Sequence, residues 1–347
     1  MISPHHRVLV IGTGSIGERH TRCFLATDRV SVKICELKRE VRQRVAETYN
    51  VESCVALEQA LENPPEIAVI CTPAHLHVPI ARQLVLAGSH VLVEKPLSTS
   101  LDGVDQLCWE VEQAERVVGV AYVSRQNPML AEMKLAIDSG RFGKPLQLIV
   151  QSGQHFPTYR PAFRETYYRD RETGGGAIQD GLTHSINTAE WLVGPADRVA
   201  ADCDRLVLDG VNVEDTVHVI ARHGSVMASY TLNQHQAPNE TRIQVVCEKG
   251  VVRYESHQQR WRSMVSPGNS WIVENQVSLE RDDLFIRQAE MFLDAVENGS
   301  AVSCNLAEGL QTLQVNLAIL AAADTGSWQQ IQAVTGATSN PPQQGLP

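Results

Sequence analysis

Three side chains have types and spacings suited to proton-transfer chemistry. Lys95 ends an apolar run, "HVLVEK" (90–95), where a charge is unexpected, and Pro96 follows it. Asp180 and His184 are spaced i, i+4, so on a helix they would share one face. An amine, a carboxylate and an imidazole can together bind a hydroxyl group and take its proton. Each feature alone has an ordinary explanation, because strand-end lysines are usually solvated and Asp-x-x-x-His pairs are often plain helix-face pairs.

A glycine-rich turn near the N-terminus suggests a separate binding site. The stretch "VIGTGSIGERH" places Gly12, Gly14 and Gly17 in GxGxxG spacing, after an apolar strand and at the start of a helical pattern. Gly12 permits the tight turn, Gly14 lets the backbone approach a pyrophosphate, and Gly17 allows close packing of helix on strand. The N–H groups at the helix start, around Ser15 and Ile16, would bind the phosphates. This turn therefore predicts dinucleotide binding.

The residues after the second strand bear on which dinucleotide is bound. Glu36 ends that strand, nineteen residues after Gly17. A carboxylate there can accept hydrogen bonds from the adenosine ribose hydroxyls, and it repels a 2′-phosphate. Lys38 and Arg39 follow and could instead pair with that phosphate. The sequence favours NAD and leaves NADP as the alternative.

The first third of the chain alternates strands with helices. Short apolar runs predict strands at 7–12, 31–36, 67–72, 90–95 and 117–122, and helical patterns lie between them at 15–26, 38–49, 56–62, 77–87 and 100–115. Strands and helices at this spacing form a parallel sheet with right-handed crossovers. We therefore expect a Rossmann domain over residues 1–124.

The pattern changes near residue 125. A helix is predicted at 128–140, followed by longer strands with period-two alternation at 146–156, 199–208, 214–223, 225–235, 241–248 and 251–257, and by helices at 282–298 and 306–324. Strands joined by tight turns favour antiparallel pairing. The overall prediction is an α/β protein with a second α/β domain over 125–335, built on an open, largely antiparallel mixed sheet. The Pro- and Gly-rich stretch 336–347 is predicted to be a loose tail.

Composition narrows the functional class. The chain has 347 residues, a net charge of −10 and no long basic run, which argues against nucleic acid as a partner. Its eight cysteines are scattered singly, without a CxxC pair, so neither a metal site nor a disulfide framework is predicted. No apolar stretch is long enough to suggest a membrane span, and no signal-peptide pattern is seen. A reducing cytoplasm is the expected location.

Two further motifs resemble those of a known family. The segment "CTPAHLHVPIARQLVLAGSHVLVEKPLS" (71–98) resembles the Thr-Pro…His…Glu-Lys-Pro block of the Gfo/Idh/MocA oxidoreductases, which include glucose–fructose oxidoreductase and inositol dehydrogenase. The segment "GGGAIQDGLTHSINTAEWLVG" (174–194) resembles the family's Gly-rich, Asp-x-x-x-His helix. With the glycine turn, the likeness runs from residue 7 to about 328. It implies a Rossmann domain followed by an α/β domain with an open mixed sheet.

The resemblance also assigns roles to individual residues. It implies that Lys95, Asp180 and His184 serve the reaction. In our interpretation His184 accepts the hydroxyl proton, Asp180 binds the substrate and steadies the imidazole, and Lys95 orients the oxygen and stabilises the developing alkoxide. Burial beside a positively charged nicotinamide would favour the neutral amine, so Lys95 is the alternative proton acceptor.

Four more positions follow from the same block of the family. Glu94 would contact the nicotinamide ribose. Thr72 and His77 would line the cofactor cleft, and Pro73 would shape its turn.

The stretch before the Asp-x-x-x-His motif offers candidate substrate contacts. Within "HFPTYRPAFRETYYRDRETGGG" (155–176), the tyrosines could stack on sugar rings and the arginines could bind carboxylate or phosphate. The stretch contains Tyr159, Arg160, Arg164, Tyr167, Tyr168 and Arg169, of which Tyr159, Arg160, Arg164 and Tyr168 are the chosen candidates. A polyhydroxylated small molecule, with an acidic or phosphate group as an option, is the predicted substrate. A surface or subunit-contact loop with solvated arginines explains the stretch equally well.

The sequence as a whole predicts an NAD(H)-dependent oxidoreductase that transfers a hydride to or from a secondary alcohol of a sugar, sugar derivative or cyclitol. One alternative is a glycosidase-like enzyme that retains NAD and cleaves by oxidation and elimination. Another is a non-catalytic, dinucleotide-binding regulatory protein on the same fold. The resemblance also implies a homodimer or homotetramer.

Overall fold

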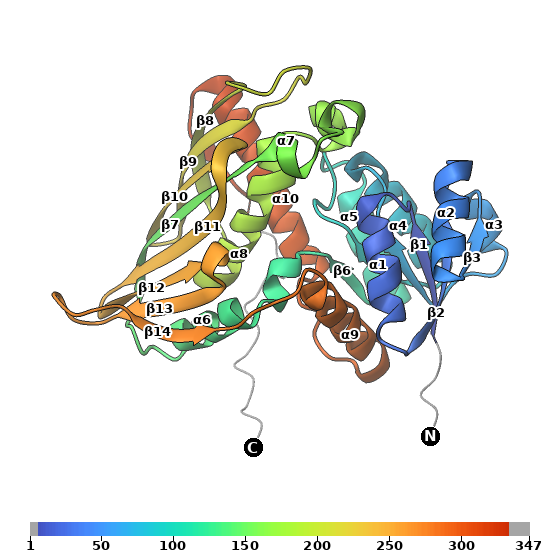
Figure 1. Cartoon of the computed structure of the whole chain (residues 1–347), viewed down its shortest axis with the longest axis horizontal. Coiled ribbons are helices and arrows are strands. Elements are labelled where there is room, and N and C mark those ends of the chain that lie inside the picture. Colours follow the sequence, from blue (N-terminus) through green and yellow to red (C-terminus); the bar gives the residue numbers. More distant parts are fainter. Residues whose placement is uncertain (1–5, 333–347) are drawn as a thin grey trace.

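The computed structural model describes residues 6–332, which form two β-sheets side by side with helices around them (Figure 1). The predicted tail at 336–347 lies outside the described residues.

The N-terminal sheet is parallel and has six strands. They are β1 (His6–Ile11), β2 (Val30–Cys35), β3 (Glu52–Cys54), β4 (Ile67–Ile70), β5 (His90–Val93) and β6 (Val118–Val120). Their order is β3-β2-β1-β4-β5-β6, so the direction of winding reverses between β1 and β4. Ligands of such sheets bind at this reversal, beyond the carboxyl ends of the strands. The sequence predicted every strand except β3, whose three residues are too few for a periodic signal.

Five helices connect these strands. They are α1 (Ser15–Leu25), α2 (Arg39–Tyr49), α3 (Leu57–Leu61), α4 (His77–Leu86) and α5 (Val104–Ala114). Each begins within a few residues of the predicted position, because the apolar periodicity of this part of the chain changes sharply between strand and helix.

The second sheet is mixed and has nine strands. They are β7 (Pro145–His155), β8 (Arg198–Asp204), β9 (Thr216–His223), β10 (Val226–Asn233), β11 (His235–Cys247), β12 (Gly250–Glu255), β13 (Arg260–Met264), β14 (Ile272–Gln276) and β15 (Gln329–Gln330). Their order is β14-β13-β12-β11-β7-β10-β9-β8-β15. Only β7 and β10 pair in parallel, which confirms the predicted fold class. The strands β13, β14 and β15 were not predicted.

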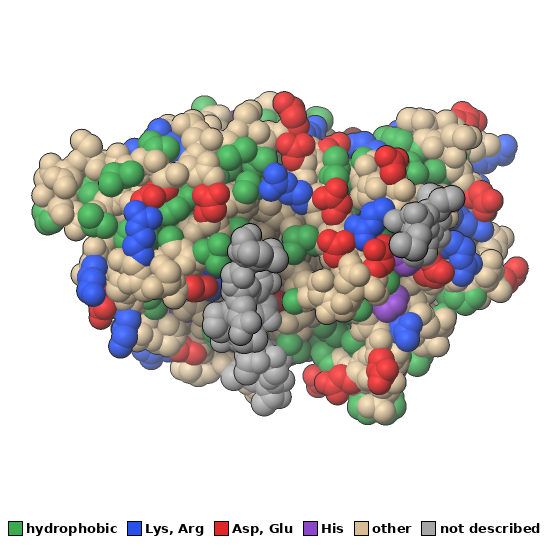
Figure 2. Space-filling model, turned by 90° about the horizontal axis from the view of Figure 1, so that it is seen from below, with side chains coloured by type: hydrophobic (Ala, Val, Ile, Leu, Met, Phe, Trp, Pro, Cys, Tyr) green, Lys and Arg blue, Asp and Glu red, His purple; other side chains and the backbone are tan. Residues whose placement is uncertain are grey.

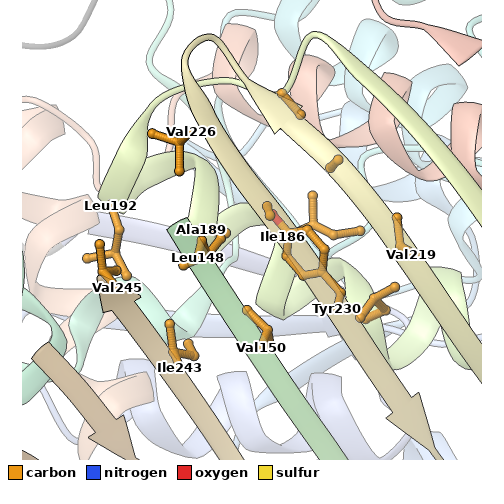
Figure 3. Packing of buried hydrophobic residues seen from close by; sticks show 14 of the residues in the cluster. Leu148, Val150, Ile186, Ala189, Leu192, Val219, Val226, Tyr230, Ile243 and Val245 are labelled. Carbon is orange, nitrogen blue, oxygen red and sulfur yellow. The ribbon is translucent and has the colours of Figure 1, made fainter. Parts of the chain in front are cut away.

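One face of this sheet packs against helices and holds the larger core. Alternate residues of the strands, among them Leu148 and Val150 of β7, point toward Ile186 and Ala189 of α8 (Thr183–Val193) (Figure 3). Helix α6 (Pro128–Asp138) packs at the other end of the same face. This packing holds α8, and with it the Asp-x-x-x-His motif, against the sheet.

Two late helices tie the sheets together. Helix α9 (Asp283–Asn298) contributes Phe292 and Leu293 to the core of the N-terminal sheet. Helix α10 (Leu306–Thr325) contributes Leu310 to the N-terminal core and Ile319 to the core of the second sheet. Chain order therefore places α9 after the second sheet, whereas packing places it on the first.

Helix α10 is also the one described helix that is long and apolar enough to cross a membrane, and 56% of its most apolar window is buried inside the protein. Its place in both cores accounts for that composition. On the face seen in Figure 2, acidic and basic side chains are interspersed.

Candidate active site

A cleft of about 1430 Å³ lies between the two sheets. One wall is formed by the glycine turn and by the loops that follow β4 and β5. The opposite wall is formed by β7, β10, the short helix α7 (Phe156–Tyr159), the loop after it and the start of α8. The winding reversal of the parallel sheet thus opens into the same space as the Asp-x-x-x-His motif.

The glycine turn has the shape of a phosphate cradle. Gly12 adopts φ +80°, and a Cβ on Gly17 would lie 1.8 Å from the Gly12 carbonyl oxygen, so both positions require glycine. A Cβ on Gly14 would meet nothing within 4 Å, because Gly14 faces the open cleft. Helix α1 begins at Ser15 without a side-chain cap, which leaves its first N–H groups available to an anion. The turn therefore fits a dinucleotide.

Glu36 lies beside this turn at the end of the second strand. Its carboxylate accepts the backbone N–H of Thr13 at 2.8 Å and that of Lys38 at 2.9 Å, and both Glu36 and Lys38 line the cleft. Because two backbone donors hold the carboxylate, its negative charge is positioned without help from a ligand.

The loops after β4 and β5 are held together by His77. Its ring nitrogens lie 2.8 Å from the Thr72 carbonyl oxygen and 2.9 Å from the Pro96 carbonyl oxygen, and the side chain is buried. Burial lowers the pKa of His77. The Thr72 hydroxyl is buried at the cleft and has no hydrogen-bond partner among the described residues. Thr72 therefore presents a free polar atom at the cleft, whereas His77 braces the loops.

Glu94 forms its hydrogen bonds with other groups of the protein. One carboxylate oxygen lies 2.7 Å from Nε2 of His20 on α1, and the other accepts the backbone N–H of Lys95 at 3.0 Å. Burial favours the neutral acid, but the hydrogen bond and charge of His20 and the charge of Lys95 hold the pKa of Glu94 below its usual range. His20 was not singled out from the sequence; its only signal is its place three residues after Gly17.

Lys95 and Asp180 meet across the cleft. Nζ of Lys95 donates to the Asp180 backbone oxygen at 2.8 Å and to its carboxylate at 3.0 Å, and both side chains are 15% exposed. The Lys95–Pro96 peptide bond is cis. The Tyr167 hydroxyl donates to the same carboxylate oxygen at 2.9 Å. Burial opposes ionisation of Asp180, but the Lys95 charge and these hydrogen bonds lower its pKa.

His184 lies next to this pair on a less regular helix than expected. Asp180 belongs to a π-helical turn, Ala177–Leu182, and His184 is the second residue of α8, so the two do not share a continuous α-helix. Burial and the Lys95 charge lower the pKa of His184 to about 3. Its ring packs edge-on against Tyr122, and its buried Nδ1 has no hydrogen-bond partner among the described residues.

This geometry corrects one expectation about Asp180. Its described hydrogen bonds go to Lys95 and Tyr167, and none joins it to the His184 imidazole. The π-helical turn, which differs from the regular α-helix assumed from the i, i+4 spacing, directs the carboxylate across the cleft toward β5.

The turn that carries Asp180 is supported from behind by Glu214. This buried carboxylate accepts the backbone N–H of Ile178 at 3.0 Å. A Cβ on Gly176 would lie 2.5 Å from the same carboxylate, and a Cβ on Gly175 would lie 2.1 Å from the Tyr168 carbonyl oxygen. The glycine run thus lets the backbone pack tightly behind the site.

The four candidate substrate residues have different surroundings. Tyr159 is 46% exposed and Arg160 is exposed, and both line the cleft. Arg164 lies away from it, paired with Asp209 and packed over Phe163.

Tyr168 is 2% exposed within a small aromatic cluster and donates its hydroxyl to Gln234. Its neighbour Tyr167 reaches Asp180 instead. Both tyrosines line the cleft, and because Tyr167 also binds Asp180 we prefer Tyr167 to Tyr168 as the candidate contact.

Strands of the mixed sheet contribute neutral polar side chains to the cleft, in addition to the exposed Arg160. They are Ser152, Gln154, Asn233, Asn239 and Thr241. Residues 6–332 contain no group of three His, Cys, Asp or Glu side chains that could hold a metal ion. This lining offers many hydrogen bonds and little charge.

Comparisons with known proteins agree with this architecture. The description "Oxidoreductase family, NAD-binding Rossmann fold" matches residues 6–122, and the description "GFO/IDH/MocA C-terminal domain" matches residues 130–253.

Relatives and solved structures extend the match over most of the chain. A levoglucosan dehydrogenase of Pseudarthrobacter phenanthrenivorans is 25% identical over 94% of this chain and 98% of its own length. A myo-inositol 2-dehydrogenase of Thermotoga maritima is 25% identical over 70% of this chain and 73% of its own. A solved levoglucosan dehydrogenase, in complex with NADH and levoglucosan, superimposes with a TM-score of 0.86 at 21% identity, covering 94% of this chain and 99% of that one.

The two family matches follow each other along the chain and correspond to the parallel sheet and the mixed sheet. They confirm the resemblance seen in the glycine turn, the Glu-Lys-Pro block and the Asp-x-x-x-His motif. The chain belongs to the GFO/IDH/MocA family of oxidoreductases and carries its NAD-binding Rossmann domain.

Proposed function

We propose that this protein is a dehydrogenase that oxidises, reversibly and with NAD, one secondary hydroxyl group of a neutral sugar or cyclitol. The observation that carries the proposal is the meeting of Lys95, Asp180, Tyr167 and His184 in a cleft shared with the glycine turn. Named relatives that act on levoglucosan and inositols support the substrate class.

The assignment of NAD as the cofactor rests on how well the residues of the cleft fit a dinucleotide. The glycine cradle, the uncapped start of α1 and the carboxylate of Glu36 would hold the dinucleotide, with the Thr72 hydroxyl as a further polar contact. NAD supplies a nicotinamide that accepts or returns a hydride. Because Glu36 places a negative charge where NADP carries its 2′-phosphate, we expect NAD to be preferred over NADP.

Side chains of the protein would accept the proton of the substrate hydroxyl group and stabilise the charge left on its oxygen. His184 is neutral at physiological pH, because its pKa is lowered to about 3, so its ring nitrogen is free to receive the hydroxyl proton. The same low pKa makes it a weak base, and Lys95 is therefore the alternative acceptor. Lys95 would hydrogen-bond the same oxygen and stabilise negative charge that develops on it. Asp180 anchors the Lys95 ammonium and, with Tyr167, offers oxygen atoms to neighbouring substrate hydroxyls.

A neutral substrate is supported by the side chains that the mixed sheet contributes to the cleft. Arg164 is neutralised by Asp209, and the cleft residues on β7, β10 and β11 include amide and hydroxyl groups. Such groups match the alternating donors and acceptors of a polyol. The predicted option of an acidic or phosphate-bearing substrate loses one of its two arginines.

The test is a panel of neutral sugars, anhydrosugars and cyclitols, including levoglucosan and myo-inositol, offered to the full chain with NAD or NADP. We expect at least one neutral polyol to reduce NAD, followed by the absorbance of NADH. Lys95→Met should lower kcat roughly 10²–10³-fold while the Kd for NADH stays within about twofold.

The matched control is Lys134→Met, because Lys134 also pairs with an aspartate, Asp138, but on the surface. Turnover by Lys95→Met equal to that of the control would refute the proposed role of Lys95.

Self-association is a second, smaller proposal. The face of the nine-stranded sheet opposite the helices exposes Ile220 and Met227 at 53% and 56%. Such a face suits the homodimer or homotetramer that the family resemblance implies. Light scattering of the full chain would measure its mass, and a monomer at all concentrations would exclude the proposal.

A further inference from the structure

Arg19 and Arg281 form a cationic corner beside the glycine turn, and neither was singled out from the sequence. Arg19 lies on α1, four residues after Ser15 and three after Ile16, so it shares their helix face. Helical side chains lean toward the N-terminus of their helix, which directs Arg19 toward the uncapped N–H groups of α1. Arg19 lines the same cleft as Ser15 and Ile16.

Arg281, two residues before the start of α9, lies at the same corner although it is far from Arg19 along the chain. The Arg19 guanidinium lies 4.9 Å from the centre of the Phe285 ring, and its Nε lies 3.3 Å from Asp282. Arg281, which immediately precedes Asp282, also lines the cleft and is exposed. Burial, and then the charge of Arg281, lower the pKa of Arg19, which indicates that the two cations repel each other there.

The acids nearby do not relieve this repulsion at the cleft. Asp282 binds Arg22 through both carboxylate oxygens, at 2.5 and 2.8 Å. Asp283 accepts the backbone N–H of Glu280. None of these three acids lines the cleft, whereas Arg19 and Arg281 both do. Asp282 pairs with Nε of Arg19 from outside the cleft and is shared with Arg22, so two cationic side chains line the cleft beside the helix start and none of these acids lines it with them.

We propose that Arg19 and Arg281 bind the diphosphate of the dinucleotide, opposite the N–H groups of the glycine turn. The diphosphate would thus be held between backbone N–H groups at the start of α1 and two guanidinium groups, one of which lies just before α9, far from α1 along the chain. Guanidinium groups bind phosphate oxygens through paired N–H donors. The inference rests on the NAD dependence proposed above and adds that the second half of the chain completes the cofactor site.

The experiment compares Arg281→Gln with Arg287→Gln in the full chain. Arg287 lies on α9, six residues after Arg281, and is exposed but does not line the cleft, so the control removes the same charge from a neighbouring position outside the cleft. Dissociation constants for NADH, ADP and adenosine are measured by calorimetry at low and at high salt. Arg19→Gln and the double variant follow, with thermal unfolding as a check of folding.

We expect Arg281→Gln to weaken NADH and ADP roughly fivefold at low salt and less at high salt, because salt screens an exposed charge. Adenosine, which lacks phosphate, should bind every variant alike, and Arg287→Gln should match wild type. Unchanged ADP and NADH affinity in both Arg281→Gln and the double variant would overturn the inference and leave the proposed function standing. An equal loss of adenosine affinity would also overturn it. Wild-type protein that binds no NADH would overturn the proposed function itself.

Discussion

The two walls of the cleft use different parts of the polypeptide. The wall formed by the glycine turn and the loops after β4 and β5, here the Rossmann wall, presents mostly backbone groups at strand ends. The wall formed by Tyr167, the π-helical turn 177–182 and His184, here the sheet wall, presents side chains. Lys95 is the side chain through which the Rossmann wall reaches the other.

The difference shows how each wall is kept in shape. On the Rossmann wall, glycines at 12 and 17 let the backbone pass where any Cβ would collide. On the sheet wall, buried polar groups behind the surface hold each element, as Glu214 holds the π-helical turn. The glycine turn of the Rossmann wall should therefore be disturbed by adding a methyl group. The contacts of the sheet wall should be disturbed by removing a polar or charged side-chain group.

The largest effect is expected on the sheet wall, from Asp180→Asn. The amide keeps the shape but removes the charge that anchors the Lys95 ammonium, so kcat should fall roughly 10²–10³-fold. NADH affinity should stay within about twofold, because Asp180 belongs to the other wall. Steady-state kinetics and NADH titration provide the two measurements.

The matched control for Asp180→Asn is Asp138→Asn, which breaks an exposed lysine–aspartate pair on α6. Exposed pairs of this kind contribute little, so both readouts should be unchanged. A comparable loss of kcat in the control would show that the effect does not belong to the sheet wall.

The Rossmann wall should respond to Gly14→Ala in the opposite way. The added methyl meets no protein atom within 4 Å but projects into the cleft, so folding should be retained while NADH affinity falls roughly 10-fold. Calorimetric titration and thermal unfolding separate the two.

Gly17→Ala sharpens this test, because its methyl would lie 1.8 Å from the Gly12 carbonyl oxygen. That variant should lose stability, by about 3 kcal/mol or more, as overpacked sites do. Equal unfolding temperatures for the two variants would contradict the distinction between an open and a closed glycine.

A smaller effect concerns the stability cost of burying His184. Its pKa is about 3 in the folded protein, below the usual 6.5, so as pH falls below 6.5 the unfolded chain takes up a proton that the folded one does not. Keeping His184 neutral therefore costs no stability above pH 6.5, and it lowers the free energy of unfolding progressively as the pH falls toward 3.

His184→Asn removes that decline. Between pH 7 and pH 5 the variant should gain up to roughly 2 kcal/mol relative to wild type, measured by urea unfolding at both values. His77, whose pKa is also lowered by burial, stays in both proteins, so their difference isolates His184. A difference independent of pH would contradict the buried neutral imidazole.

The smallest effect is expected from Arg164→Ala. This arginine is bound to Asp209 and does not line the cleft, so KM for the polyol found in the panel should change less than about twofold. A KM rise of 10-fold would return Arg164 to the substrate site and would favour an anionic substrate.

The predictions made from the sequence differ in their outcome between the Rossmann wall and the sheet wall. The glycine turn, the strand ends and the Glu-Lys-Pro loop were found in place because turns and buried strands are encoded by neighbouring residues. The choice of Tyr168 was replaced by Tyr167, and Asp180 was found bound to Lys95 instead of steadying His184. Those outcomes depend on which way a side chain points, and the π-helical turn that decides it has no periodic signal.

The sequence by itself determined the family, the two-sheet architecture, the dinucleotide turn and the candidates for the reactive groups. Local steric rules and apolar periodicity act over a few residues and can be read directly. The tertiary structure alone decided that His20 holds Glu94, that Glu214 supports the turn of Asp180, and that Arg281, just before α9, lines the same cleft as Arg19. These contacts join residues far apart in the chain, and only the packing of the two sheets around shared helices brings them within reach.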